Sequence, residues 1–102
     1  MTTGSTDLQH VDAHLKRLLE SRQFPKTICP SEVARALSQK ELADNGVDSW
    51  RELMSAIREY VFLLRDKGEV EIVQRGIVLP ASQTLHDTRG PIRVRSATVT
   101  GT

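Results

Sequence analysis

Arginine recurs at intervals of seven in the middle of the chain, at Arg51, Arg58 and Arg65. Seven residues make about two turns of an α-helix, so these arginines and Ser55 would share one stripe of a helix. A helix fits the major groove of DNA, where guanidinium groups bind guanine edges or phosphates. We therefore name Arg51, Ser55, Arg58 and Arg65 as candidate DNA-binding residues.

The same stripe has a second interpretation, because an acidic residue directly follows each of the three arginines. Such alternation of charge is typical of a helix face that is simply exposed to solvent. Phe62 also falls within the stripe and would offer an apolar contact to a partner protein. The alternative to DNA binding is therefore a partner-binding surface that includes Phe62.

A second group of arginines lies toward the C-terminal end. Residues 75–102 contain four arginines and one acidic residue, a net charge of +3, whereas residues 1–74 contain ten basic and twelve acidic residues, a net charge of −2. Arg75 stands at an expected turn, from which it could reach a phosphate or a minor groove. Arg93 and Arg95, together with Arg89, could add salt-sensitive contacts. Protection of an edge strand by charge explains these arginines equally well.

The histidines and the cysteine carry weaker signals. His10 and His14 stand four apart, a spacing that can present two imidazoles to zinc, with Cys29 or His86 as further ligands. A surface pair explains the spacing better, because Val11 stands where a zinc protease needs glutamate. Cys29 has no histidine in its own motif, which disfavours a nucleophilic role. The sequence therefore predicts a noncatalytic protein without a metal or a cofactor.

The composition limits size and location more than it defines a function. A chain of 102 residues, 38% of them hydrophobic, suffices for one domain. Its net charge of +1 is low for a strongly basic nucleic-acid binder. The single cysteine excludes an intramolecular disulfide, and neither a signal-peptide pattern nor an apolar run of about 18 residues is present, so we expect a cytoplasmic protein that does not enter membranes.

Helical periodicity and capping signals predict three main helices. The first is expected from Thr6 or Asp7 to about residue 22, where residues 23–25 break it, and the second over residues 30–37. Ser49 and Glu52 form a capping box that starts the third, which continues to Lys67. Residues 39–47 are expected to be a polar connection that could hold one turn of helix. The apolar face of the third helix is formed by Trp50, Leu53, Met54, Ile57, Val61 and Leu64.

Alternating apolar residues predict a small antiparallel sheet. Residues 27–29 could form a short strand, and a hairpin is expected from Val70 through a turn at Arg75 and Gly76 to residues 77–79. Residues 92–95 alternate strictly, which predicts one more strand with Arg93 and Arg95 on the same face. This order of elements is that of an α+β winged helix, a helix-turn-helix with a small antiparallel β-sheet.

Three segments carry a resemblance to a known family. They are residues 27–35 (TICPSEVAR), residues 50–54 (WRELM), and residues 74–76 (QRG) with the later 90–95 (GPIRVR). From about Val11 to Arg95 the chain resembles the small bacterial family of unknown function catalogued as DUF3253. The resemblance implies a winged-helix fold and brings no established activity, substrate or site.

The combined predictions are a single winged-helix domain over residues 7–95, with disordered residues 1–6 and 96–102. We expect a noncatalytic DNA-binding or transcription-related module whose partner is double-stranded DNA. The alternative is a protein-interaction module that uses the same scaffold without binding DNA.

Overall fold

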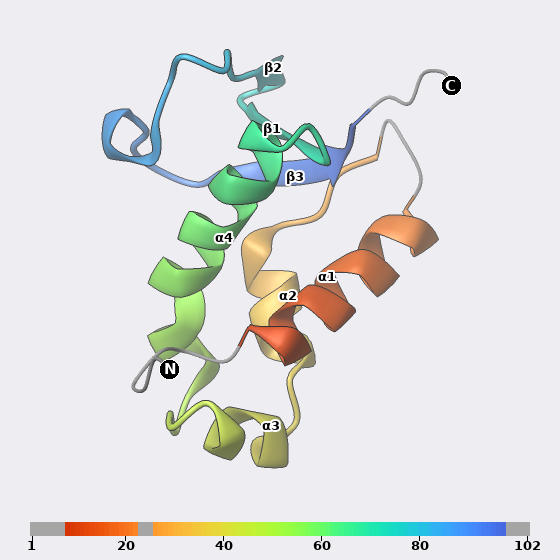
Figure 1. Cartoon of the computed structure of the whole chain (residues 1–102), viewed down its shortest axis with the longest axis vertical. Coiled ribbons are helices and arrows are strands. Elements are labelled where there is room, and N and C mark those ends of the chain that lie inside the picture. Colours follow the sequence, from red (N-terminus) through yellow and green to blue (C-terminus); the bar gives the residue numbers. More distant parts are fainter. Residues whose placement is uncertain (1–7, 23–25, 98–102) are drawn as a thin grey trace.

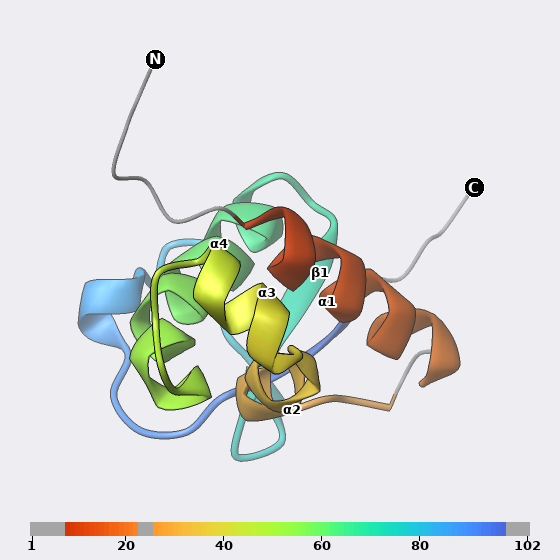
Figure 2. The ribbon, with the colours of Figure 1, turned by 90° about the horizontal axis from the view of Figure 1, so that it is seen from below.

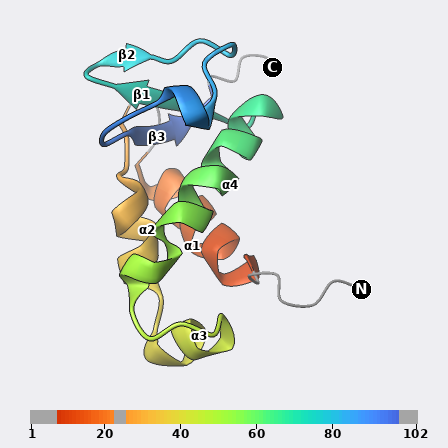
Figure 3. The ribbon, with the colours of Figure 1, turned by 90° about the vertical axis from the view of Figure 1, so that its left-hand side faces the viewer.

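The protein, described by a computed structural model over residues 8–22 and 26–97, has an α+β arrangement consistent with a winged-helix-like fold. Its α-helices lie below a three-stranded antiparallel sheet, with α3 farthest from the sheet (Figures 1 and 3). The helices are α1 (Gln9–Ser21), α2 (Pro30–Ala36), α3 (Gln39–Asp44) and α4 (Met54–Asp66), with the 3₁₀ helices η1 (Trp50–Leu53) and η2 (Leu85–Asp87). The strands are β1 (Val70–Gln74), β2 (Ile77–Val78) and β3 (Arg93–Ser96).

One hydrophobic core joins the helices to the sheet. The first helix, α1, packs against α2, α2 packs against α4, and α4 packs against β1. The helix α1 buries Val11, Leu15 and Leu19 at helical spacing, and Ile57 and Val61 of α4 are fully buried. Burial of each such side chain contributes about 1.5–3 kcal/mol before conformational entropy is subtracted.

The predicted start of the third helix is confirmed, but its first turn is tighter than an α-helix. The Ser49 hydroxyl accepts a hydrogen bond of 3.2 Å from the amide of Arg51, and η1 begins at Trp50. The Glu52 carboxylate accepts from the amide of Asp48, at 3.2 Å, where the predicted capping box required the amide of Ser49. The helix then continues as α4 to Asp66.

The connection predicted over residues 39–47 contains a helix of its own, α3. Ser38 and Glu41 cap its start reciprocally: the Ser38 hydroxyl accepts from the Glu41 amide at 3.1 Å, and the Glu41 carboxylate accepts from the Ser38 amide at 2.9 Å. Leu42 anchors the helix in the core. The turn of helix expected here is present, and the caps and the anchor extend it to the six residues of α3.

The hairpin predicted after Gly68 is confirmed as part of a sheet with strand order β2-β1-β3. Strand β3 pairs antiparallel with β1 from Val70 opposite Ser96 to Val73 opposite Arg93. The strand predicted over residues 27–29 is reduced to a bridge between Ile28 and Val94, with backbone hydrogen bonds of 2.7 and 2.8 Å.

The last strand extends one residue beyond the predicted Arg95, into the segment expected to be a tail. Ser96 belongs to β3, and the amide of Ala97 donates to the backbone oxygen of Glu69 at 3.2 Å. The predictions for residues 1–6, for the start of the first helix at Thr6 or Asp7, for the break at residues 23–25 and for the tail from residue 98 lie outside the described residues. Across the described ranges, none of the helices has both the length and the apolar character of a membrane-spanning helix.

Candidate nucleic-acid interface

The predicted arginine stripe divides into an exposed half and a buried half. Arg51 and Ser55 are exposed and Arg58 is half-buried, whereas Phe62 retains only 5% of its surface and the Arg65 side chain 9%. The division follows the helix axis, because the later half of α4 packs under the loop that follows β2. The stripe is therefore not one continuous binding face.

Phe62 and Arg65 have structural roles. The Phe62 ring belongs to the hydrophobic core, so the expectation of an exposed docking surface at Phe62 is wrong. The Arg65 guanidinium lies 4.9 Å from the centre of that ring and donates to the backbone oxygens of Gln83, at 2.6 Å, and Pro80, at 3.3 Å. These contacts hold residues 80–83 against α4, and they leave Arg65 unsuited to bind an external phosphate.

At the start of η1, two arginines stack on the indole of Trp50. The guanidinium carbon of Arg51 lies 4.6 Å from the centre of the ring, and that of Arg35, from α2, lies at 6.0 Å. Cation–π contacts fix such side chains without neutralising their charge. Arg35 and Arg51 therefore place two positive charges where α2 meets η1.

Arg58 connects α4 to the loop before β3. Its Nη1 donates a hydrogen bond of 3.1 Å to the backbone oxygen of Gly90, whose φ of 88° lies in the left-handed region that favours glycine. Beside this contact is a hollow lined by Ser55, Arg58, Glu59, Leu85 and Thr88. Two of the candidate DNA-binding residues therefore line the boundary between α4 and this loop.

The turn between β1 and β2 presents Arg75 at its tip. Arg75 has a φ of 54° and Gly76 a φ of 80°. Two successive left-handed residues are typical of a tight two-residue hairpin, in which asparagine or glycine is favoured at the first position. Arginine is therefore held there in an unfavourable backbone conformation, with its side chain exposed.

Three arginines from two separate segments line one hollow, which we call the basic groove. Its volume is about 270 Å³, and Arg75 contributes to it from the hairpin, whereas Arg89 and Arg93 contribute from the chain before and within β3. The remaining lining residues are Cys29, Val73, Gln74, Gly90, Pro91 and Ile92, so none of the described residues that line the groove is acidic. A groove with this lining attracts anions.

Gln74 holds the two sides of the basic groove together. Its side-chain amide donates to the backbone oxygen of Arg89 at 2.7 Å and to that of Pro91 at 3.2 Å. Because Arg58 binds Gly90 between them, residues 89–91 are fixed to both the hairpin and α4. The arginines of the groove are thus positioned by neighbouring ordered structure.

The two arginines of β3 share one face, as predicted, but differ in their availability. Arg95 is paired with Glu71 across the sheet, with 2.7 Å between Nε and Oε1. Arg93 donates to the hydroxyl of Thr27 and has an exposed side chain, 51% accessible, with Glu32 more distant at 3.9 Å. Arg93 can therefore contact an external anion more readily than Arg95.

Glu32 places a negative charge next to Arg93 of the basic groove. Partial burial opposes its ionisation, but the hydrogen bond from the Cys29 amide and the contact with Arg22 outweigh burial, and the pKa of Glu32 is lowered. Arg22 is the nearer partner, at 2.8 Å against 3.9 Å for Arg93. Ionised Glu32 therefore lies closer to Arg22 than to Arg93, and the Arg93 side chain stays 51% exposed to other partners.

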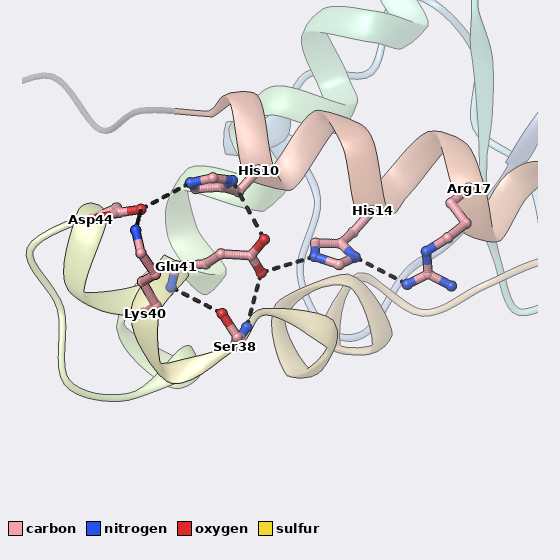
Figure 4. A network of polar contacts seen from close by, with 7 residues as sticks. All are labelled: His10, His14, Arg17, Ser38, Lys40, Glu41 and Asp44. Carbon is pink, nitrogen blue, oxygen red and sulfur yellow. Dashed lines mark hydrogen bonds and ion pairs between the residues drawn. The ribbon is translucent and has the colours of Figure 1, made fainter.

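The two histidines of α1 contact α3 (Figure 4). His14 Nε2 lies 3.0 Å from Glu41 Oε1, and His10 Nε2 lies 3.2 Å from Asp44 Oδ2. The described residues contain no group of three or more histidine, cysteine or acidic side chains that could hold a metal ion. The network connects two helices.

Three residues of the surface were absent from the candidates named from sequence. Arg35 and Trp50 form the stacked cluster, and Gln74 holds the groove. Arg89, which lines the groove, was among the arginines that the basic C-terminal segment indicated. The roles of Arg35, Trp50 and Gln74 depend on contacts between segments that no local pattern specifies.

The comparisons with known proteins identify a family of unknown function. The chain matches, over residues 8–97, the model of a family described as "Protein of unknown function (DUF3253)". The search of curated proteins gave no match. The matched residues cover most of the chain and include every arginine of the basic groove, and the chain therefore belongs to the DUF3253 family.

Proposed function

We propose that this protein is a noncatalytic module that binds double-stranded DNA through its basic groove and the adjoining start of α4. The observation that carries the proposal is the meeting of Arg75, Arg89 and Arg93 in one groove whose described lining includes no carboxylate. Positively charged grooves on a rigid support bind phosphates without any chemical step. The proposal uses Arg58, Ser55 and Arg51 as the continuation of this surface along α4.

The proposed contacts are mainly to the DNA backbone. Glu52 and Glu59 lie exposed next to Arg51 and Arg58, so they oppose close approach of the whole helix to a phosphate strand. The described lining of the groove contains no acidic side chain, and the Glu32 carboxylate that lies 3.9 Å from Arg93 is closer to Arg22, at 2.8 Å. Phosphate contacts position a protein on a duplex but carry no sequence information. We therefore expect α4 to discriminate only modestly between DNA sequences.

A titration of labelled duplex DNA, followed by fluorescence anisotropy at several salt concentrations, tests the proposal. Contacts from three arginines should give a slope of about −3 in a plot of log affinity against log salt. Each arginine removed from the groove should reduce the magnitude of that slope by about 1. Absence of binding above background at about 50 mM salt would overturn the proposal.

A matched pair of double variants separates the groove from general charge. Arg75→Gln with Arg89→Gln removes two charges from the groove, and Lys16→Gln with Lys40→Gln removes two from exposed positions of α1 and α3. The proposal requires the first pair to weaken binding much more than the second. Equal losses would indicate net charge alone and would contradict a groove-specific contact.

A second candidate function is docking of a partner protein, and the exposure of β2 favours it. Ile77 and Val78 are 68% and 40% exposed, and β2 forms an edge of the described sheet. Such an edge can pair with an added strand. Pro80, which has no amide hydrogen, follows soon after and shortens the usable edge. Ile77→Ser should abolish docking by this route and leave DNA binding unchanged, whereas loss of both would contradict separate surfaces.

A further inference from the structure

We infer that Arg75 enters the minor groove of the duplex and gives the protein a preference for A·T-rich DNA. The inference rests on the proposed DNA binding and adds the feature of the duplex that is recognised. Arg75 lies at the tip of a tight hairpin, where the loop between β1 and β2 projects beyond α2 (Figure 2). A projecting tip is the part of the surface that can enter a narrow groove.

The hairpin tip is slim. Gly76 has no side chain, and a Cβ placed there would meet no heavy atom within 4 Å apart from those of its chain neighbours, so the space beside Gly76 is open. The minor groove of B-DNA is about 6 Å wide, too narrow for a helix but wide enough for one extended side chain. The Arg75 side chain, next to this glycine, is the basic group of the turn that fits it.

The Arg75 guanidinium is available for such a contact. Within the described part of the chain it has no hydrogen-bond or ion-pair partner, in contrast to Arg65 and Arg95. Arg89 and Arg93 line the same groove of the protein and can bind phosphates beside the inserted side chain. Insertion of Arg75 into the minor groove, with Arg89 and Arg93 on the adjacent phosphates, would form a small DNA-binding surface.

The residue type explains the preference for A·T pairs. A·T-rich tracts have a narrow minor groove with an enhanced negative potential, which attracts inserted arginine. G·C pairs place the guanine 2-amino group in that groove and widen it. Arginine sheds water more easily than lysine, so it gains more from a narrow groove. The same insertion by lysine should therefore bind with less discrimination.

Three duplexes of equal length, differing only at their centre, test the inference. One has A·T pairs, one has G·C pairs, and one has inosine·C pairs, which keep the major-groove pattern of G·C but lack the 2-amino group in the minor groove. We expect the A·T and inosine·C duplexes to bind at least about fivefold more tightly than the G·C duplex. Arg75→Lys should reduce that ratio toward one and keep most of the affinity, whereas Arg89→Lys, the matched control, should leave the ratio unchanged.

The outcomes separate this inference from the proposed function. Equal binding of all three duplexes, or binding of inosine·C like G·C, overturns minor-groove recognition and leaves DNA binding standing. If Arg75→Lys leaves the ratio of A·T to G·C affinities unchanged, minor-groove recognition by Arg75 is also overturned, because another residue must then recognise the minor groove of the DNA. Failure of all three duplexes to bind overturns the proposed DNA binding itself. Circular dichroism of each variant checks that it is folded.

Discussion

Gln74 donates a hydrogen bond of 2.7 Å to the backbone oxygen of Arg89, a residue fifteen positions further along the chain. This bond, with a second to Pro91 at 3.2 Å, ties the hairpin to the loop that precedes β3. It therefore brings the two halves of the basic groove together, although Gln74 itself carries no charge.

Replacement of Gln74 by alanine should weaken DNA binding without altering the charge of the groove. Two hydrogen bonds are lost, so the free energy of unfolding should fall by about 1–2 kcal/mol, as measured by urea denaturation. Affinity for duplex DNA should fall several-fold, because Arg89 is no longer held opposite Arg75. Gln39→Ala, at an exposed position of α3, should change neither quantity. Unchanged affinity in Gln74→Ala would show that the groove does not depend on this link.

Replacement of Arg75 by asparagine should stabilise the protein while it weakens DNA binding. The φ of 54° at this position costs arginine about 1 kcal/mol, and asparagine tolerates the conformation better. The urea midpoint should therefore rise as the affinity falls. Arg89→Asn also removes one positive charge from the groove, but Arg89 is not in the left-handed conformation. This variant should therefore weaken binding with no gain in stability. A urea midpoint for Arg75→Asn at or below the wild-type value would contradict the expected cost of the left-handed backbone conformation at Arg75.

Arg65 and Arg89 should show opposite consequences when each is replaced by alanine. Arg65→Ala removes charge-assisted hydrogen bonds to the oxygens of Gln83 and Pro80 and should lower the free energy of unfolding by about 2–3 kcal/mol. Arg89→Ala, at an exposed position, should change it by less than about 0.5 kcal/mol. At temperatures where both are folded, only Arg89→Ala should weaken DNA binding. If folded Arg65→Ala loses affinity for DNA, Arg65 belongs to the DNA-binding surface after all, contrary to this prediction.

The attachment of α3 should weaken in acid. The pKa of Glu41 is lowered, first by the hydrogen bond from the Ser38 amide and then by His14 (Figure 4). Because its pKa is lower in the folded than in the unfolded chain, the ionised group stabilises the fold above its ordinary pKa of 4.5. That stabilisation is lost as the pH falls through the lower folded value.

Thermal unfolding of Glu41→Gln across the acidic range measures this contribution. The variant should be less stable than wild type near neutral pH, and the difference should shrink as the pH falls below about 4.5. Glu59→Gln, at an exposed position of α4, serves as the control and should show no comparable trend. A difference that stays constant with pH would mean that ionisation of Glu41 does not contribute.

The elements that local patterns define could be predicted from the sequence. The capping residue Ser49 marked the start of η1 and α4, and the alternation of residues 92–95 placed Arg93 and Arg95 on one face of a strand. Arg75 and Gly76 marked the hairpin turn. The pair Ser38 and Glu41 is also a local capping box, so the full length of α3 was predictable. Only a turn of helix was expected there, because the helix is polar and buries one residue, Leu42.

The tertiary structure alone decided which arginines are available. Arg51, Arg58 and Arg65 are evenly spaced and each is followed by an acidic residue, yet Arg65 binds backbone oxygens of the loop at Pro80 and Gln83, and Arg51 stays exposed. The sequence by itself determined the helices, the hairpin and the excess of positive charge after Gln74, because capping, turns and alternation act over a few residues. The basic groove arises from hydrogen bonds and packing between distant segments, and those contacts exist only once the chain has folded.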